Sequence, residues 1–119
     1  MIRYHKENGA GLVAELTDPD FRINEAQNAL DLIAEIGLME CNNLIIHKIN
    51  LTPDFFELRT GLAGEVLQKF SNYRSRLAIV GDFSQYTSKS LNDFIRECNR
   101  GKMICFADNL ENALLKLRS

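Results

Sequence analysis

The chain has 119 residues, of which 45% are hydrophobic and 25% are charged, the composition of an ordinary globular protein. This length predicts one domain over residues 1–119, which buries about two-thirds of its unfolded surface without help from a metal or a disulfide. The formal net charge of −2 argues against nucleic acid and against anionic membranes as partners, because both attract basic proteins.

The first residues and the cysteines predict a cytoplasmic location. Residues 1–8 lack the apolar core of a signal peptide, and no apolar run approaches membrane-spanning length. Cys41, Cys98 and Cys105 are odd in number and contain no CxxC pair, so we expect free thiols in a reducing compartment. Cys98 and Cys105 stand in apolar patterns that predict buried side chains.

Two short strands are predicted at the N-terminus, over residues 2–7 and 12–16. Asn8-Gly9 between them is a favoured hairpin dipeptide, and Ala10-Gly11 offers a bulge beside the turn. Pro19 ends the second strand because it has no N–H to donate. The strands therefore form an antiparallel pair.

A first helix is predicted over residues 25–36. Asn24 and Gln27 have the spacing of a capping box at its start. Gly37 suits the left-handed position that follows many helix C-termini.

The stretch of residues 43–84 predicts a strand, a helix and a second strand. Its two apolar runs, residues 44–46 and 77–80, are rich in β-branched side chains, as in strands buried on both faces of a parallel sheet. About two dozen residues separate them, enough for the helical crossover that parallel neighbours need. Thr52 as N-cap and Pro53 as first helical residue mark the start of that helix.

Gly61 and Gly64 interrupt the predicted crossover helix, because glycine lowers helix stability by up to about 1 kcal/mol relative to alanine. One interpretation is that they let the sheet or a ligand approach the helix closely. The other is that the helix begins late, near Thr60, so that Thr52 caps only a short preliminary turn.

The C-terminal third predicts a helix, a strand and a last helix. Ser90 has capping-box spacing to Asp93, and the helix that it starts ends at Gly101. Residues 102–107 read as a strand, and Asp108 caps the final helix.

The predicted order is β-β-α-β-α-β-α-β-α, an α/β fold with helices packed on a mixed, mostly parallel five-stranded sheet. The hairpin makes the first strand the antiparallel member. The pattern leaves open whether helices cover both faces of the sheet. If all the helices lay on one face, something else would have to cover the apolar residues of the other face. A second copy of the chain, in a homodimer, is one such cover.

Four segments resemble a bacterial family of domains of unknown function: FFELRTGLAG, LAIVGDF, SKSLNDF and NRG, at residues 55–64, 77–83, 88–94 and 99–101. The likeness covers most of the chain from Asn24 onward, and it implies a stand-alone bacterial cytosolic protein with no assigned activity. The order of elements is also similar to that of anti-sigma-factor antagonists and related STAS domains, in which a hairpin opens a series of β/α units.

The STAS likeness can be examined at one motif. Antagonists carry an acidic residue, a phosphorylated Ser, a Ser or Thr, and a Gly at the start of the helix after the third strand. The matching tetrapeptide here is Leu58-Arg59-Thr60-Gly61. Its Thr-Gly pair agrees, whereas Arg59 stands at the acceptor position, so the resemblance implies neither a phosphorylation switch nor a kinase partner.

Ligands of parallel sheets usually bind outside the carboxyl ends of the strands. Short polar side chains follow the predicted strands at that edge, and a late helix start would bring residues 59–61 close to them. The candidate binding residues are Asp54, Arg59, Thr60, Gly61, Asp82 and Ser84. The competing interpretation is that they are cap and turn formers, as such residue types often are.

No catalytic set, metal site or cofactor is predicted. His5 and His47 are the only histidines, and neither has ligand spacing to a cysteine or a carboxylate, so we interpret both as satisfied sheet residues. The glycines at 61 and 64 lack the Lys-Ser/Thr of a phosphate loop.

These observations favour a non-enzymatic binding or regulatory module that acts through the carboxyl edge of its sheet. Its partner would be another protein or a small anionic ligand. The alternative is a small nucleotide- or phosphate-binding domain, or an enzyme, that uses Asp54, Thr60 and Asp82.

Overall fold

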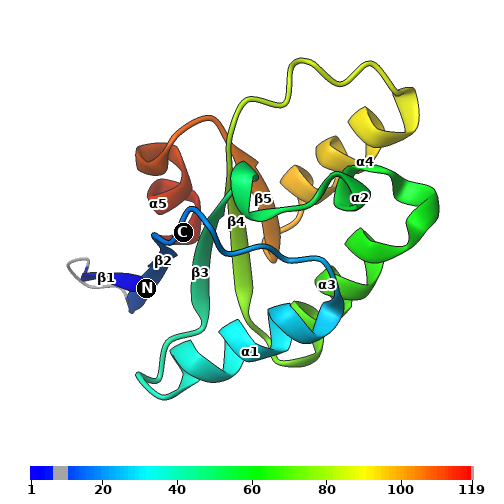
Figure 1. The fold of residues 1–119 in the computed structure, drawn as a ribbon. Coiled ribbons are helices and arrows are strands. Elements are labelled where there is room, and N and C mark those ends of the chain that lie inside the picture. The colour runs from blue at the N-terminus through cyan, green and yellow to red at the C-terminus, as the bar shows by residue number, and fades with distance from the viewer. Residues whose placement is uncertain (7–10, 119) are drawn as a thin grey trace.

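The computed structural model of the chain describes residues 1–6 and 11–118, which form a five-stranded sheet with helices on both sides (Figure 1). The strands are β1 (Ile2–Lys6), β2 (Leu12–Leu16), β3 (Asn43–His47), β4 (Arg76–Val80) and β5 (Ile104–Ala107). The helices are α1 (Ala26–Gly37), α2 (Pro53–Phe56), α3 (Leu62–Asn72), α4 (Lys89–Arg100) and α5 (Leu110–Arg118). Two 3₁₀ turns, η1 (Lys48–Asn50) and η2 (Leu58–Thr60), flank α2.

The strands lie in chain order across the sheet, β1-β2-β3-β4-β5. β1 is antiparallel to β2, and every other neighbouring pair is parallel. β3 and β4 pair from Asn43↔Arg76 to His47↔Val80, with α3 in the connection between them. The predicted α/β fold, its parallel central unit and its antiparallel first strand are therefore confirmed.

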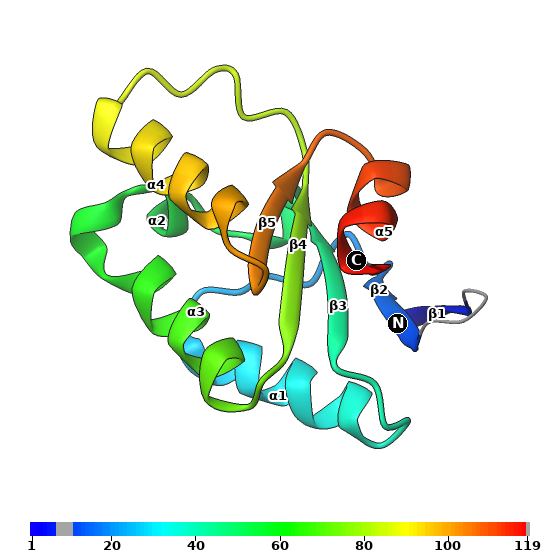
Figure 2. The same ribbon diagram turned by 180° about the vertical axis from the view of Figure 1, so that it is seen from behind.

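Helices cover both faces of the sheet, which decides the point that the sequence pattern left open. Alternate strand residues such as Ile46 and Ile79 join the larger core, which contains side chains of α1 and α3 with α4 packed against it. Ile45 and Ala78, on the opposite face, pack with α5 in a smaller core. Figure 2 shows α5 on the other side of the sheet from α1, α3 and α4.

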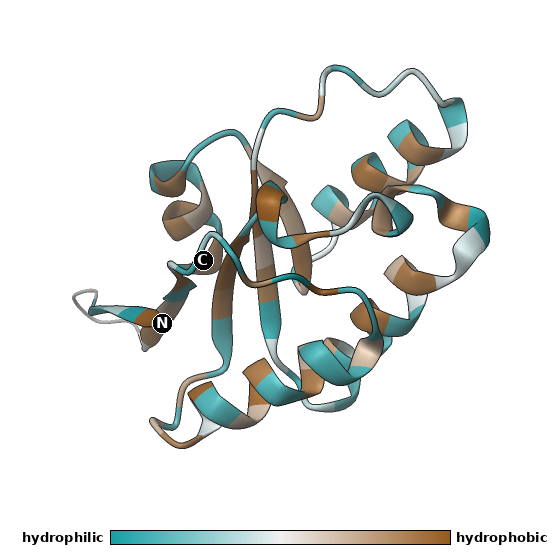
Figure 3. Cartoon of the chain, viewed as in Figure 1, coloured by the Kyte–Doolittle hydropathy of each residue, from teal (hydrophilic) through white to brown (hydrophobic). Residues whose placement is uncertain are grey.

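Hydrophobic and hydrophilic residues alternate along the helices (Figure 3), and hydrophobic residues of α1, α3 and α5 belong to the two cores. Phe55 of α2 and Phe70 of α3 are the largest fully buried side chains. Among the described helices, none has the length and apolar character that crossing a bilayer requires.

The helix caps lie one or two residues away from their predicted positions. The N-cap of α1 is Glu25, not Asn24, and the Asn28 side chain accepts hydrogen bonds from both of their backbone N–H groups. Ser88 replaces Ser90 as the N-cap of α4, with its hydroxyl accepting from the Leu91 N–H. Ser88 and Ser90 are equally good N-cap types, so the pattern could not choose between them. Glu25 is not a favoured N-cap type, and no local pattern predicted it.

Two further local predictions are corrected in the same way. At the start of α5, Asn109 rather than Asp108 accepts from a first-turn N–H, that of Asn112. Gly37 is the last residue of α1, and the left-handed residue beyond it is Glu40, at φ 54°. The predicted turn at Asn8-Gly9 and the bulge at Ala10-Gly11 involve residues outside the described part of the chain.

The crossover helix begins late, because α3 starts at Leu62, after the η2 turn. Gly61 has φ 80°, the left-handed conformation, and separates η2 from α3. A Cβ at Gly61 or at Gly64 would meet nothing within 4 Å, so neither glycine is there for close packing. Gly61 supplies a backbone conformation, whereas Gly64 lies exposed in the first turn of α3.

Replacing the two glycines by alanine should therefore have opposite effects. Gly61→Ala forces a Cβ into the left-handed region, and we expect it to lower the free energy of unfolding by about 1–2 kcal/mol. Gly64→Ala should raise it by about 0.5–1 kcal/mol, because alanine is the better helix former. Urea unfolding followed by circular dichroism measures both, and equal losses in the two variants would contradict this account.

The three cysteines are free thiols, as predicted. Cys41 and Cys105 are buried, whereas Cys98 is only half-buried. Burial raises the pKa of Cys98 to about 11, with smaller contributions from Cys105 and Glu97, and burial also raises the pKa of Cys105. Both thiols are therefore protonated near neutral pH, which makes them poor nucleophiles.

Candidate functional site

A groove of about 550 Å³ opens at the carboxyl edge of the sheet, between the α2–η2 segment and the loop that leads from β4 into α4. We call it the edge groove. Its lining residues are Pro53, Phe56, Glu57, Leu58, Arg59, Gln85, Tyr86, Thr87, Ser88, Ser90 and Leu91. The volume is within the range of small-molecule sites, and the lining combines aromatic rings with hydroxyl, amide and charged groups.

Two aromatic rings form the central wall of the edge groove. The rings of Phe56 and Tyr86 stack with centroids 4.9 Å apart and an interplanar angle of 16°. A second cavity, of about 380 Å³, shares this wall and is lined in addition by Lys48 and Leu51. A planar ligand group would find aromatic surface in either cavity.

Lys48 holds the β4–α4 loop against the end of β3. Its Nζ donates to the Asp82 carbonyl at 2.9 Å and to the Gln85 Oε1 at 2.8 Å, and it lies 4.9 Å from the centre of the Tyr86 ring. The stem of Lys48 also passes close to Gly81, where a Cβ would come within 2.7 Å of the Lys48 Cβ. Glycine at 81 thus allows the lysine to reach across the loop.

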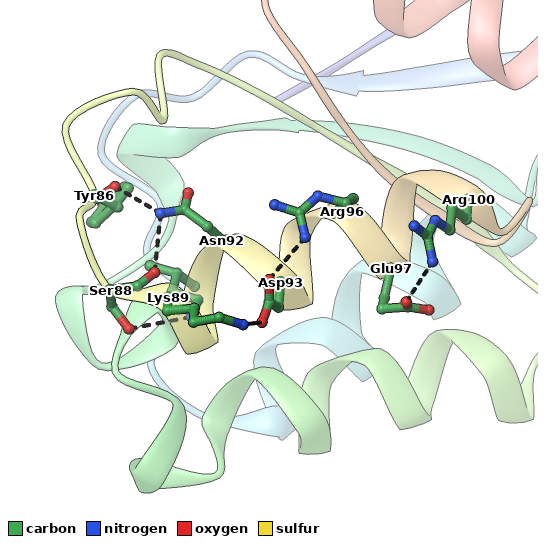
Figure 4. Close-up of polar contacts among 9 residues, drawn as sticks. Tyr86, Ser88, Lys89, Asn92, Asp93, Arg96, Glu97 and Arg100 are labelled. Carbon is green, nitrogen blue, oxygen red and sulfur yellow. Dashed lines mark hydrogen bonds and ion pairs between the residues drawn. The ribbon is translucent and has the colours of Figure 1, made fainter.

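The start of α4 fixes the other end of this loop (Figure 4). The Asn92 side chain donates to the carbonyl groups of Tyr86 and Ser88, each at 3.0 Å. The Ser88 hydroxyl caps the helix by accepting from Leu91. The groove wall around Tyr86 is therefore held from both sides.

Farther along α4, Figure 4 shows charged side chains that pair with one another. Lys89 and Arg96 both contact Asp93, and hydrogen bonds from them hold the pKa of that carboxyl below its ordinary value. Arg100 pairs with Glu97 at 2.9 Å. These exposed pairs lie along the helix rather than in the edge groove, and such pairs contribute little to stability.

Of the six predicted site residues, Arg59 lines the edge groove. Its side chain is exposed, and its Nε lies 3.5 Å from a carboxylate oxygen of Glu57. The Thr60 hydroxyl is instead turned inward on its own turn, 2.7 Å from the Asp54 carbonyl and 2.9 Å from that of Glu57. Gly61 provides the left-handed link described above.

Asp82 and Ser84 form a local turn after β4. The Asp82 Oδ1 accepts from the Ser84 hydroxyl at 2.6 Å and from the Ser84 N–H at 2.9 Å. These hydrogen bonds hold the pKa of Asp82 below its ordinary value. Phe56, Tyr86 and Lys48 are not among the six predicted residues, although Tyr86 follows β4 at the predicted edge. Short polar side chains were selected there, whereas Phe56 and Tyr86 contribute rings and Lys48 reaches the loop with a long side chain.

A family model for a domain of unknown function, DUF4180, matches residues 8–117. The chain belongs to the DUF4180 family. No curated protein and no solved structure matches it. The family match begins earlier than the likeness seen from Asn24 onward and includes β2, so it covers the four parallel strands of the sheet.

A second polar cluster of this DUF4180 domain lies on the α5 face of the sheet, and the sequence-based search did not find it. Glu15 of β2 accepts hydrogen bonds from His5 of β1 at 2.9 Å and from His47 of β3 at 2.8 Å, one at each carboxylate oxygen. The Glu15 side chain is only 9% exposed. The expectation that both histidines are satisfied within the sheet is thus confirmed.

The two histidines stabilise the ionised form of Glu15. Burial by itself raises the pKa of this carboxyl, but the hydrogen bonds from His5 and His47 outweigh it and hold the pKa below its ordinary value. Glu15 is therefore ionised near neutral pH. No group of three or more His, Cys, Asp and Glu residues within the described ranges could hold a metal ion.

Proposed function

We propose that this DUF4180 domain is a non-enzymatic binding module that takes a small anionic ligand into the edge groove. The observation that carries the proposal is the groove itself, whose lining combines a stacked aromatic wall with serine and threonine residues and an arginine. We infer that the ligand has an anionic group joined to an apolar or planar part.

The two halves of the groove support different parts of such a ligand. Phe56 and Tyr86, with Leu58 and Leu91 beside them, offer apolar surface. Arg59 offers a guanidinium group that binds carboxylate or phosphate oxygens through two parallel hydrogen bonds.

The start of α4 adds a second set of donors for the anionic group. The hydroxyl groups of Ser88 and Ser90 line the groove where this 12-residue helix begins. A helix N-terminus carries partial positive charge and unpaired N–H groups, so it favours an anion at the same place.

The alternative proposal, a nucleotide or phosphate site built from Asp54, Thr60 and Asp82, has weaker support. The Thr60 hydroxyl and the Asp82 carboxylate are engaged in their own turns. A cytoplasmic site of action is part of the main proposal, and the three free thiols support it.

A thermal-shift screen with nucleotides, sugar phosphates and organic acids tests the proposal. A ligand present at 100 times its Kd should stabilise the fold by about 2.7 kcal/mol. Arg59→Ala should remove most of that shift. Arg100→Ala is the matched control, because Arg100 pairs with Glu97 outside the groove, and it should keep the shift.

Two outcomes would contradict the proposal. One is a screen in which no anionic compound raises the melting temperature of the unmodified chain. The other is a stabilising compound whose effect is the same in Arg59→Ala as in Arg100→Ala, because the ligand would then bind elsewhere.

A further inference from the structure

The His5–Glu15–His47 cluster joins three neighbouring strands through one carboxylate. His5 and His47 approach Glu15 from β1 and β3, and their side chains are 20% and 34% exposed. A proton can therefore reach either imidazole from solvent, whereas the carboxylate between them is nearly buried. Histidine is the side chain whose charge ordinarily changes between pH 5 and 8.

His47 has a second role, at the turn that follows β3. His47 and Asn50 form a capping box over η1, in which the Asn50 side chain accepts from the His47 N–H at 3.0 Å and the His47 side chain faces the Asn50 N–H. With its proton on Nε2, neutral His47 donates to Glu15 and keeps its other ring nitrogen as an acceptor toward the Asn50 N–H. Neutral His47 satisfies both contacts at once.

Protonation of His47 conflicts with this arrangement. Imidazolium carries an N–H at both ring positions, so the capping nitrogen can no longer accept from Asn50. Asn50 is buried, and its side chain also donates to the carbonyl groups of Asp18 and Phe21. When His47 is protonated, the Asn50 N–H therefore loses this acceptor within a buried turn. We expect the η1 turn to shift as a result.

The disturbed turn carries Lys48, the residue that holds the edge groove. Lys48 directly follows His47 and is the first residue of η1. Its ammonium group binds the β4–α4 loop at Asp82 and Gln85 and lies over the Tyr86 ring. His47 is thus the direct chain neighbour of Lys48, whose ammonium group positions Tyr86.

Other charged residues lie on the elements around the cluster, and α5 carries Lys116 and Arg118 in its last turn. Arg3 is the strand neighbour of Glu15 on β1, and Asp18 lines a cavity of about 170 Å³ together with Glu15 and His47. On the adjoining part of this face, α5 presents apolar side chains: Leu110, Ala113, Leu114 and Leu117.

We propose that the His5–Glu15–His47 cluster is a proton-operated latch, in which protonation of His47 releases the η1 cap and shifts Lys48 and Tyr86 at the edge groove. Its regulatory meaning rests on the proposed function of the groove. The latch itself needs no ligand, so its test is independent of ligand binding.

The test is an NMR titration of the ligand-free chain from pH 8 to pH 5. We expect the ring signals of His47, the backbone amide of Asn50 and the ring signals of Tyr86 to change with a common midpoint. In His47→Gln, the Asn50 and Tyr86 changes at that midpoint should disappear. His5→Gln is the control, because His5 contacts Glu15 but not η1, and its Tyr86 signals should still follow His47.

The unmodified chain alone can overturn the proposal, so the test does not depend on a variant that folds. If the ring signals of His47 change while the Asn50 amide and the Tyr86 ring stay unchanged, the latch is not coupled to the groove. If the Tyr86 change persists in His47→Gln, another group causes it, and the proposal fails.

Discussion

Phe70→Ala is expected to lower the free energy of unfolding by about 3–5 kcal/mol, the largest effect of any single truncation that we predict. Phe70 is 0% exposed and belongs to the larger core between the sheet and its helices. Truncation removes a whole ring from contact with its neighbours and leaves a cavity in the core. The surrounding side chains are closely packed, so they can close this cavity only in part. Urea unfolding should show a lower midpoint with an unchanged slope.

Tyr73→Ala is the matched control for this loss. Tyr73 is an aromatic residue just beyond the end of the same helix, but it is 61% exposed. Its truncation should change the free energy of unfolding by no more than about 0.5 kcal/mol. Similar losses in the two variants would mean that Phe70 is not the core residue that the structure shows.

Glu15→Gln is expected to lower the free energy of unfolding at pH 7 by about 1–3 kcal/mol. Glutamine keeps the size of the side chain but presents one acceptor oxygen instead of two. One of the two histidines then loses its hydrogen-bond acceptor at the Glu15 position, where the side chain is only 9% exposed. The loss should appear in chemical unfolding at neutral pH.

The same substitution should also change how stability depends on pH. The pKa of Glu15 is held below its value of 4.5 in the unfolded chain, so its contribution is complete above that value. As the pH falls below about 4.5 and through the lower folded-state pKa, the carboxylate is protonated and the contribution is lost. The stability difference between the original chain and Glu15→Gln should therefore shrink on acidification.

Unfolding measured from pH 7 to pH 3 tests this dependence. Glu65→Gln, at an exposed position on α3, serves as the control and should stay within about 0.5 kcal/mol of the original chain at neutral pH. A Glu15→Gln profile that runs parallel to that of the original chain over the whole range would refute the role given to the two histidines.

Much of the fold followed from local patterns in the sequence. The apolar runs at residues 44–46 and 77–80, and the length of chain between them, predicted the parallel β3–α3–β4 unit correctly. Helix caps were less well placed, because Ser88 and Ser90 are equivalent in type and only the folded backbone decides which hydroxyl reaches a free N–H.

The carboxyl edge of the sheet and six candidate residues there were selected from the sequence. The carboxyl edge of the sheet does carry the groove, and Arg59 lines it. Asp82 and Thr60 were selected for their polarity, yet their polar atoms close their own turns. The aromatic wall joins Phe56 to Tyr86 across 30 positions of sequence, a separation that no local pattern reports.

The sequence by itself determined which segments form strands and helices, because periodicity and turn chemistry act over a few residues. Tertiary structure alone decided that α5 covers the second face of the sheet and that His5, Glu15 and His47 meet on it. The physical reason is register: a shift of one residue between neighbouring strands would send these side chains to opposite faces. Register is set by the packing of the whole sheet rather than by any one strand.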